Sequence, residues 1–302
     1  HRRMPAMDTR FPEPDISQVH AMVSRQFPEW ADLEIHPVDV SGWDNRTFHL
    51  GDTLLVRMPS AVHYVAQVEK EQRWLPILSR SISLSMPMPV AKGMPCAEFP
   101  HPWSIYKWLP GESLASSPDV NQKALAQSLA KFLRELQGIS TADAPRPGAH
   151  CFYRGAHLSV YDAETQQAIA ALAGIVDVNA VSTVWSKALR CPYFGDPVWF
   201  HGDIAPGNLL MTAGQLSAVI DFGCCGVGDP ACDLAFAWTD LDTDARECFL
   251  SEIGSDANMT FRAMGWALWK ALITAVDCVD RDAQSWQRSM KTIRNVLRVA
   301  LE

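Results

Sequence analysis

Hydrophobic and polar positions follow two different periods along the chain, and the change of period divides it into two parts. Residues 34–59 form short alternating runs split by Ser41-Gly42 and Gly51-Asp52, which predicts antiparallel strands joined by tight turns. Proline-interrupted strands are expected over 86–95 and 102–112. Helical spacing predicts a helix over 64–80 between these strands, and a Pro-Asp start signal predicts another over 15–27. The first part is therefore β-rich with one helix embedded in it.

The later part of the chain is mainly helical. Apolar residues of 121–138 recur at i, i+4 and i+7, and Gly138 fits a C-terminal cap. Helical patterning continues beyond Tyr161 to Pro197 and again from Asp229 to the end. Between these stretches, residues 199–223 predict a small β insert in which Gly214 turns the chain. An α+β protein with two lobes and a ligand cleft between them is expected, with a boundary near Pro110-Gly111.

Charge and composition narrow the class of partner. The chain has 302 residues and a formal net charge of −8, which disfavours a nucleic-acid partner because phosphates attract Lys and Arg. No apolar run reaches the ~18 residues of a membrane span, and the first fifteen residues lack the apolar core of a secretory signal. Eight cysteines without a CxxC pair indicate reduced thiols. A cytoplasmic protein is expected, with no nucleic-acid or membrane partner and an unknown oligomeric state.

The stretch FHGDIAPGNLL, residues 200–210, carries the candidate chemistry. Asn208 follows Asp203 by five residues, and Asp221 follows Asn208 by thirteen. If 209–221 is a hairpin, Asn208 and Asp221 lie side by side at its open end, where an amide and a carboxylate oxygen can bind Mg²⁺. Asp203, on the preceding bend, can orient a hydroxyl group or accept its proton. Each residue alone would more often cap a turn, but the three at this spacing indicate phosphoryl transfer.

The pattern resembles a known family. HGDxxxxN followed by AVIDFG is the signature of the aminoglycoside phosphotransferase family, whose members are distant relatives of protein kinases, and GVGDPACDLAFAW resembles its GDPxxDLA segment. In the first part, GWDNRTFHLGDTLLVRMP and VEKEQRWLPIL resemble its nucleotide-binding lobe. The resemblance covers about Ser41 to Trp269 and implies the bilobal protein-kinase-like fold. This has a small β-rich N-lobe, expected over 1–107, and a larger helical C-lobe, expected over 108–302.

The resemblance also implies roles for individual residues. It makes Asp203 the catalytic aspartate that engages the substrate hydroxyl, and it makes Asn208 and Asp221 the Mg²⁺ ligands. The phosphoryl donor would be ATP or GTP. Structural support would come from His201, Asp229 and Asp233. Contacts with the nucleotide would come from the turn at Gly42, Asp44 and Asn45 and from the backbone of Ile105, Tyr106 and Trp108.

Two positions depart from the family pattern. The family's phosphate-binding lysine falls at Arg57, whose fork can hold two phosphate oxygens and can pair with Glu71 on the next helix. Glu69 is the less favoured partner because it lies two positions earlier and faces another way. Ala205 stands two residues after Asp203, where protein kinases carry a lysine and many antibiotic kinases a histidine. Alanine cannot contact the γ-phosphate, which weakens a protein-kinase interpretation.

The acceptor is expected to be a small-molecule hydroxyl compound, with an aminoglycoside favoured. Acidic groups beside aromatic faces would suit a polycationic sugar, and the candidate residues are Asp240, Trp266, Trp269 and Asp277. The competing interpretation is that these tryptophans belong to a core. The alternatives are a macrolide kinase, a housekeeping alcohol or sugar kinase, and a nucleotide-binding protein without catalysis. An aminoglycoside acceptor would imply a role in antibiotic resistance.

Overall fold

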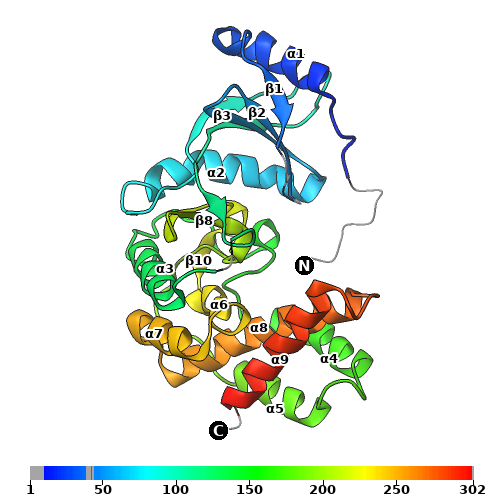
Figure 1. Ribbon diagram of the computed structural model, residues 1–302, viewed down its shortest axis with the longest axis vertical. Helices are drawn as coiled ribbons and strands as arrows, with labels where there is room; N and C mark the ends of the chain where they lie inside the picture. Colours follow the sequence, from blue (N-terminus) through cyan, green and yellow to red (C-terminus); the bar gives the residue numbers. More distant parts are fainter. Residues whose placement is uncertain (1–9, 39–41, 43, 118, 301–302) are drawn as a thin grey trace. The chain divides into compact units, whose positions relative to one another are not determined.

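The computed structural model of the chain describes residues 10–38, 42, 44–117 and 119–300. The chain forms two compact units, coloured along the sequence in Figure 1. The β-rich unit contains the described residues up to Gly111 together with Ala218–Gly223. The helical unit contains Glu112–Ser217 and the described residues from Cys224 onward. The segment Ala218–Gly223, which holds Asp221, thus returns to the β-rich unit from the middle of the helical part of the sequence.

The β-rich unit is built on a five-stranded sheet in the order β1-β2-β3-β5-β4, with every neighbouring pair antiparallel. The strands are β1 (Ile35–Pro37), β2 (Asn45–Leu50), β3 (Leu54–Pro59), β4 (Pro89–Gly93) and β5 (Trp103–Lys107). Gly51, with φ of 57°, turns the chain between β2 and β3, where the sequence predicts a turn. β5 is an interior strand with partners on both sides.

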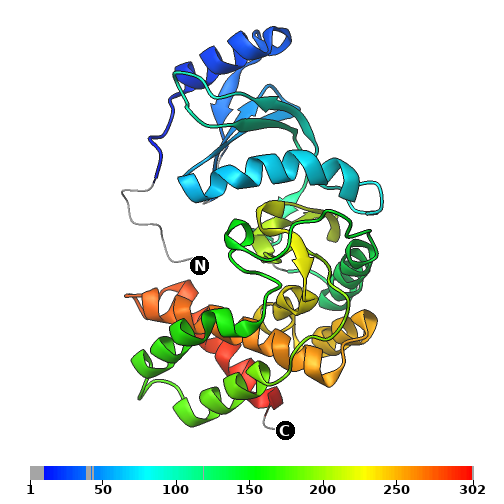
Figure 2. The same ribbon diagram turned by 180° about the vertical axis from the view of Figure 1, so that it is seen from behind.

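Two helices cover opposite faces of this sheet. Successive side chains of a strand point to opposite faces. Val56 and Ile105 pack in one core cluster with Val19 and Met22 of α1 (Ile16–Gln26). The alternate positions contact α2 (Val65–Leu78), which lies along the other face in Figures 1 and 2. Both helices lie where their apolar spacing predicts them, and the Asp15 side chain caps α1 by accepting a hydrogen bond from the Gln18 N–H.

The helical unit contains a bundle of helices and two small sheets. Its helices are α3 (Gln122–Gln137), α4 (Asp162–Ala171), α5 (Val178–Leu189), α6 (Phe236–Thr239), α7 (Thr243–Ile253), α8 (Ala257–Asp277) and α9 (Gln284–Ala300). Its strands are β6 (Glu112–Ser113), β7 (Val198–Phe200), β8 (Leu209–Thr212) and β10 (Gly226–Gly228), and β9 (Gln215–Val219) begins in it. The sheets have the orders β6-β8-β9 and β10-β7. Gly214, with φ of 76°, lies in the turn between β8 and β9.

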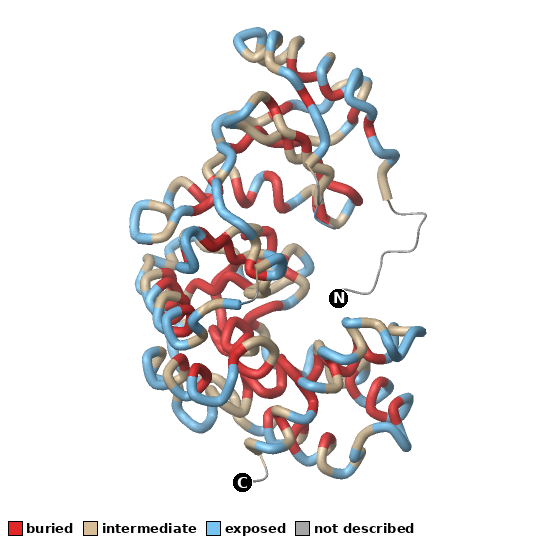
Figure 3. Tube along the Cα trace, in the orientation of Figure 1, coloured by how far each residue is buried: buried red, intermediate tan, exposed pale blue. Residues whose placement is uncertain are grey.

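Helix α8 forms the centre of the helical unit. It contacts α4, α5, α9 and the 3-10 helix Pro230–Ala235, and most of its residues from Arg262 to Ala275 are buried. The buried stretches lie inside the unit in Figure 3, and the exposed ones lie on its outer helices. In the part of the chain that the structure describes, no helix combines the length and apolarity needed to cross a membrane. The mixture of helices and antiparallel strands agrees with the predicted α+β class.

Candidate active site

The loop that follows β7 is held by a buried aspartate. Asp233, which is 1% exposed, accepts hydrogen bonds from the backbone N–H groups of His201 and Gly202, both at 2.7 Å. Burial raises the pKa of the Asp233 carboxyl, while the His201 ring and the two N–H groups lower it in part. The His201 ring is buried, and its Nδ1 accepts a hydrogen bond from the Asp203 N–H at 3.1 Å. Asp233 and His201 together fix the backbone that presents Asp203.

Gly202 fits this loop because no other residue could occupy its position without strain. Its φ is 85°, in the left-handed region that favours glycine. A Cβ at this position would lie 2.6 Å from the carbonyl oxygen of Cys224. The carbonyl of Gly202 accepts a hydrogen bond from Nε of Arg154. The glycine of the HGD motif therefore permits both the turn and a close approach of two backbone segments.

Asn208 contacts Asp203 directly. Its Nδ2 donates hydrogen bonds to the backbone oxygen of Asp203 at 2.9 Å and to the Asp203 Oδ2 at 3.2 Å. The 3-10 helix Pro206–Asn208 sets this geometry, because its tight turn returns the chain toward Asp203. The Asp203 side chain remains 25% exposed, so its carboxylate is both oriented and accessible. A carboxylate held in this way can orient a hydroxyl group and accept its proton.

Asp229 stabilises the C-terminal side of the helical unit. Its carboxylate caps the 3-10 helix Pro230–Ala235 by accepting from the Ala231 N–H. The same carboxylate forms a bidentate ion pair with Arg262 of α8, in which Nε lies 2.7 Å from Oδ2. Both side chains are at least nine-tenths buried. The two acids of the GDPACD segment thus contact protein groups and have no role at an open surface.

In the β-rich unit, Arg57 lies between two carboxylates. Its Nη1 is 3.6 Å from Oε1 of Glu71, and its Nη2 is 3.6 Å from Oδ1 of Asp221. Tyr106 from β5 donates a hydrogen bond from its hydroxyl to the Glu71 Oε2, and its ring lies 5.2 Å from the Arg57 guanidinium. Glu71 is thus the residue next to Arg57, whereas Glu69 pairs with Lys92. The buried Glu71 Oε1 makes no hydrogen bond within the described residues, so it can accept one more donor.

Burial and charge act in opposite directions on this pair. Burial raises the pKa of Glu71, and the positive charge of Arg57 lowers it only in part. For Arg57 burial lowers the pKa, but the carboxylates of Glu71 and Asp221 outweigh it and raise the pKa above the ordinary value. Arg57 therefore stays positively charged at any pH at which the protein is folded. A permanent cation beside a partly exposed Asp221 suits phosphate binding.

The predicted nucleotide-contacting segments are only partly accessible. Gly42 is exposed and a Cβ there would meet open space, while Asp44 is buried and its carbonyl accepts from the Ser60 N–H. Asn45 begins β2, and Trp43 of the same turn lies outside the described residues.

The structure places the residues predicted to contact the nucleotide base in β5 and just after it. Ile105 and Tyr106 lie inside β5, which pairs with β3 and β4. The N–H of Trp108 donates to the Thr53 carbonyl. A contact between this backbone and a nucleotide base therefore stays a prediction.

The expected aromatic wall for the acceptor requires correction. Trp266 and Trp269 of α8 are 2% and 4% exposed. The Trp269 ring stacks on Tyr161 and lies 4.7 Å from the Arg154 guanidinium, and its Nε1 donates to Glu164. Both indoles therefore belong to the interior, because a continuous apolar helix buries most of its faces.

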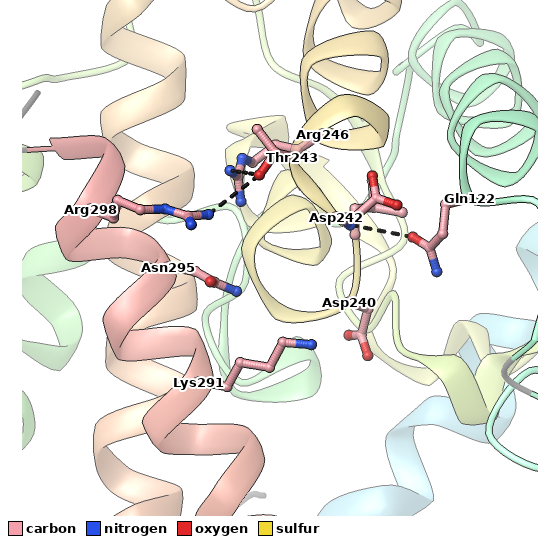
Figure 4. A pocket seen from close by; sticks show the side chains of 9 residues that line it. Gln122, Asp240, Asp242, Thr243, Arg246, Lys291, Asn295 and Arg298 are labelled. Carbon is pink, nitrogen blue, oxygen red and sulfur yellow. Dashed lines mark hydrogen bonds between the residues drawn. The ribbon is translucent and has the colours of Figure 1, made fainter.

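The two acidic candidates for the acceptor site lie apart. Asp277 is the exposed last residue of α8. Asp240 lines a pocket of about 350 Å³ in the helical unit, shown in Figure 4, and pairs with Arg288 at 2.5 Å. Asp240 is thus a predicted acceptor residue that the structure places in a pocket. A ligand there would meet its carboxylate already neutralised by an arginine.

Sequence interpretation missed one residue beside Asp203. Nζ of Lys270 on α8 lies 3.5 Å from Oδ1 of Asp203, and its side chain is 34% exposed. The sequence did carry a signal for this residue, because a lysine is unusual in a long apolar helix. The 21-residue helix α8 contains only two basic residues, Arg262 and Lys270. Each of them pairs with an aspartate of the motif region.

The residues proposed for a metal have suitable oxygens. Within the residues that the structure describes, no group of three or more His, Cys, Asp or Glu side chains forms a closed metal site. Mg²⁺ does not require one, because it usually takes one or two carboxylates and completes its shell with waters and phosphate oxygens. Since Asn208 uses its Nδ2 to bind Asp203, its carbonyl oxygen is turned away from that contact. Asn208 in the helical unit and Asp221 in the β-rich unit thus each supply an oxygen of the kind that Mg²⁺ binds.

Comparison with known proteins agrees with this geometry. A model of the phosphotransferase enzyme family matches residues 34–269. The chain belongs to the phosphotransferase enzyme family. It is 26% identical over 158 residues to an aminoglycoside 3'-phosphotransferase of Streptomyces fradiae and 36% identical over 80 residues to one of Escherichia coli. These matches cover 49% and 23% of the chain and only 56% and 30% of those relatives. The resemblance inferred from the HGD and IDFG motifs is confirmed.

Solved structures establish the fold. The chain superposes on an aminoglycoside 2''-phosphotransferase in complex with GDP and kanamycin with a TM-score of 0.71 at 17% identity, covering 93% of this chain and 98% of the other. A macrolide 2'-phosphotransferase from Brachybacterium faecium gives a TM-score of 0.60 at 17% identity, covering 91% and 97%. The protein-kinase-like α+β fold of these enzymes is therefore the fold of this chain, as predicted.

Proposed function

We propose that this chain is a Mg²⁺-dependent O-phosphotransferase that moves the γ-phosphoryl group of ATP or GTP to a hydroxyl group of a small molecule. The observation that carries the proposal is the Asp203 carboxylate, which Asn208 and the Asp233-bound backbone orient while it stays partly exposed. The Asp203 carboxylate contacts the side chains of Asn208 and Lys270.

In the proposed reaction, Asp203 aligns the acceptor hydroxyl and accepts its proton. The acceptor oxygen forms a bond to the γ-phosphorus as the bond from that phosphorus to the β,γ-bridging oxygen breaks, and the nucleoside diphosphate leaves. Because the transition state is loose, positioning and charge neutralisation supply most of the rate enhancement. Asn208 contributes by fixing the Asp203 carboxylate, so that the hydroxyl approaches in one orientation.

The β-rich unit would bind the nucleotide phosphates. Arg57 offers a guanidinium that stays charged, and Glu71 and Tyr106 hold it on the sheet face. Asn208 and Asp221 would hold Mg²⁺, which when bound neutralises charge on the phosphate oxygens. The exposed Gly42 leaves space for phosphate oxygens near the start of β2.

The relatives favour an aminoglycoside as the acceptor, and this would imply a role in antibiotic resistance. The sequence relatives are aminoglycoside phosphotransferases, and a solved neighbour holds kanamycin. A macrolide acceptor is the second candidate, because a macrolide phosphotransferase shares the fold. A housekeeping alcohol or sugar kinase is the third. All eight cysteines are free thiols, which suits the cytoplasm, where thiols stay reduced.

The test is release of ADP or GDP by the purified chain with Mg²⁺ and ATP or GTP. The acceptor panel contains kanamycin, a macrolide, choline, homoserine and neutral sugars. Asp203→Asn should lower acceptor-dependent release by about 10²–10⁴-fold, because the proton acceptor is lost. The control is Asp196→Asn, which removes an exposed carboxylate elsewhere in the helical unit and should leave release unchanged.

Two results would overturn the proposal. One is unchanged release by Asp203→Asn in a protein whose circular dichroism matches the wild type. The other is nucleotide binding without diphosphate release for any acceptor, which would favour a nucleotide-binding protein without catalysis.

A further inference from the structure

The ion pair between Lys270 and Asp203 places a positive charge beside the proposed catalytic carboxylate. Nζ of Lys270 is 3.5 Å from Oδ1 of Asp203, and Asn208 contacts Oδ2. Both carboxylate oxygens therefore already face donors from the protein. The lysine comes from α8, the buried central helix, so its backbone is held firmly while its ammonium reaches a partly exposed position.

The carboxylate of Asp240 also interacts with positively charged side chains. Arg288 pairs with Asp240, and the Thr239 hydroxyl donates to its other oxygen. Burial raises the pKa of Asp240, while Arg288, Thr239, Lys270 and Lys291 lower it in part. The charges of Lys270 and Lys291 thus act on this carboxylate as well. Asp203 and Asp240 together supply two negative charges, against three positive charges from Lys270, Arg288 and Lys291.

The pocket that Asp240 lines has a similar balance of negative and positive side chains. Its acidic residues are Asp240 and Asp242, and Asp242 caps α7 by accepting from the Ala245 N–H. Its basic residues are Arg246, Lys291 and Arg298, as Figure 4 shows. Both arginines donate to the Thr243 hydroxyl. A polycationic ligand would therefore meet more positive than negative charge in this pocket, and it would have to compete with Arg288 for the Asp240 carboxylate.

We propose that Lys270 is a specificity-determining residue of this phosphotransferase, because its ammonium occupies the side of Asp203 where an ammonium group of a polycationic acceptor would pair. The acceptor is then an uncharged hydroxyl compound, such as a sugar or an alcohol, in place of the aminoglycoside that the relatives alone favour. The inference rests on the proposed phosphotransfer reaction and decides among its acceptor classes. Two ammonium groups would then share the single negative charge of Asp203 and repel each other in a partly buried site, so Lys270 disfavours cationic acceptors.

The test measures binding of kanamycin, a polycation, by calorimetry in low salt. Lys270→Gln should bind kanamycin about tenfold more tightly than the wild type, because one like charge is removed a few ångströms from the proposed site. Lys270→Arg should behave as the wild type, since it keeps the charge. The matched control is Lys131→Gln, which removes an exposed lysine of α3 and should change nothing. Raising the salt concentration should reduce the gain, because ions screen the charge.

A chemically matched probe isolates the charge. Fully N-acetylated kanamycin has the same rings without the ammonium groups, and its affinity should not differ between the wild type and Lys270→Gln. If Lys270→Gln binds kanamycin no better than the wild type, including the case in which neither binds, the proposal is overturned. An equal gain for the acetylated probe would also overturn it, since space and not charge would then be the cause.

The experiment separates this inference from the proposed function. Binding of kanamycin needs no turnover, so it reports on Lys270 even if diphosphate release is never observed. If Asp203→Asn abolishes release but Lys270→Gln leaves kanamycin affinity unchanged, the phosphotransfer proposal stands and the role of Lys270 is wrong.

Discussion

Helix α8 makes two ion pairs with loop aspartates, and the two pairs differ in distance, donor geometry and exposure. Arg262 and Asp229 form a bidentate pair with 2.7 Å between Nε and Oδ2, and their side chains are 6% and 7% exposed. Lys270 and Asp203 lie 3.5 Å apart, and their side chains are 34% and 25% exposed. The two cations are eight residues apart in sequence, about 12 Å along the helix. One helix thus supports a closed structural pair and an open pair beside the proposed chemistry.

The difference follows from the side chains. Arginine presents a planar fork that matches a carboxylate and tolerates burial, so the Arg262–Asp229 pair can fix a segment in place. Lysine is a point charge on a flexible stem, so Lys270 can hold Asp203 loosely and still leave it accessible. A site that must bind and release a substrate needs the second kind of contact. Exposure and donor geometry therefore distinguish the structural Asp229 from Asp203, the proposed catalytic aspartate, in the same motif region.

The largest change in stability is expected from breaking the closed pair. Arg262→Met leaves the Asp229 carboxylate buried without its cation, which should lower the free energy of unfolding by about 3–5 kcal/mol. Urea unfolding followed by tryptophan fluorescence measures this change. The double variant Arg262→Met with Asp229→Asn should recover part of the loss, because no charge is then left buried alone. A loss below about 1 kcal/mol in the single variant would mean that the pair does not fix the fold.

A smaller loss of stability is expected from changing Asp233, which holds the loop that carries Asp203. Asp233→Asn removes the charge and replaces one acceptor with a donor that faces a backbone N–H, which should cost about 2–3 kcal/mol. Because His201 and Gly202 would lose their anchor, acceptor-dependent release should also fall. The same urea titration, together with the diphosphate assay, gives both values. Unchanged unfolding would show that other contacts suffice to hold the loop.

The local parts of this comparison could be predicted from the sequence. Asp203 and Asn208 are five residues apart, so the motif was sufficient to place both in one turn region, although the hydrogen bond between them was not predicted. The interior position of β5 could not be foreseen. Whether Ile105 and Tyr106 keep free backbone groups depends on which strands flank β5, and the order β3-β5-β4 is a property of the whole sheet.

The ion pairs between residues distant in sequence could not be predicted from local patterns. Asp203 and Lys270 are 67 residues apart, and Asp229 and Arg262 are 33 apart, so each pair depends on how the helices pack. Local patterning also could not decide the role of the tryptophans of α8. Their apolar helix predicts burial as well as it predicts an aromatic ligand wall, and only packing against Tyr161 and Arg154 decides for burial. The two lone basic residues of that helix carried the better signal.

The smallest change in stability is expected from breaking the open pair. Lys270→Met should alter the free energy of unfolding by less than about 1 kcal/mol, because a partly exposed ion pair contributes little and Asn208 still contacts Asp203. Urea titrations of Lys270→Met and Arg262→Met in the same buffer compare the two pairs directly. A loss near that of Arg262→Met would make Lys270 a structural residue, and a change in kanamycin affinity could then reflect a disturbed fold. A small loss combined with tighter kanamycin binding would instead assign Lys270 to substrate selection.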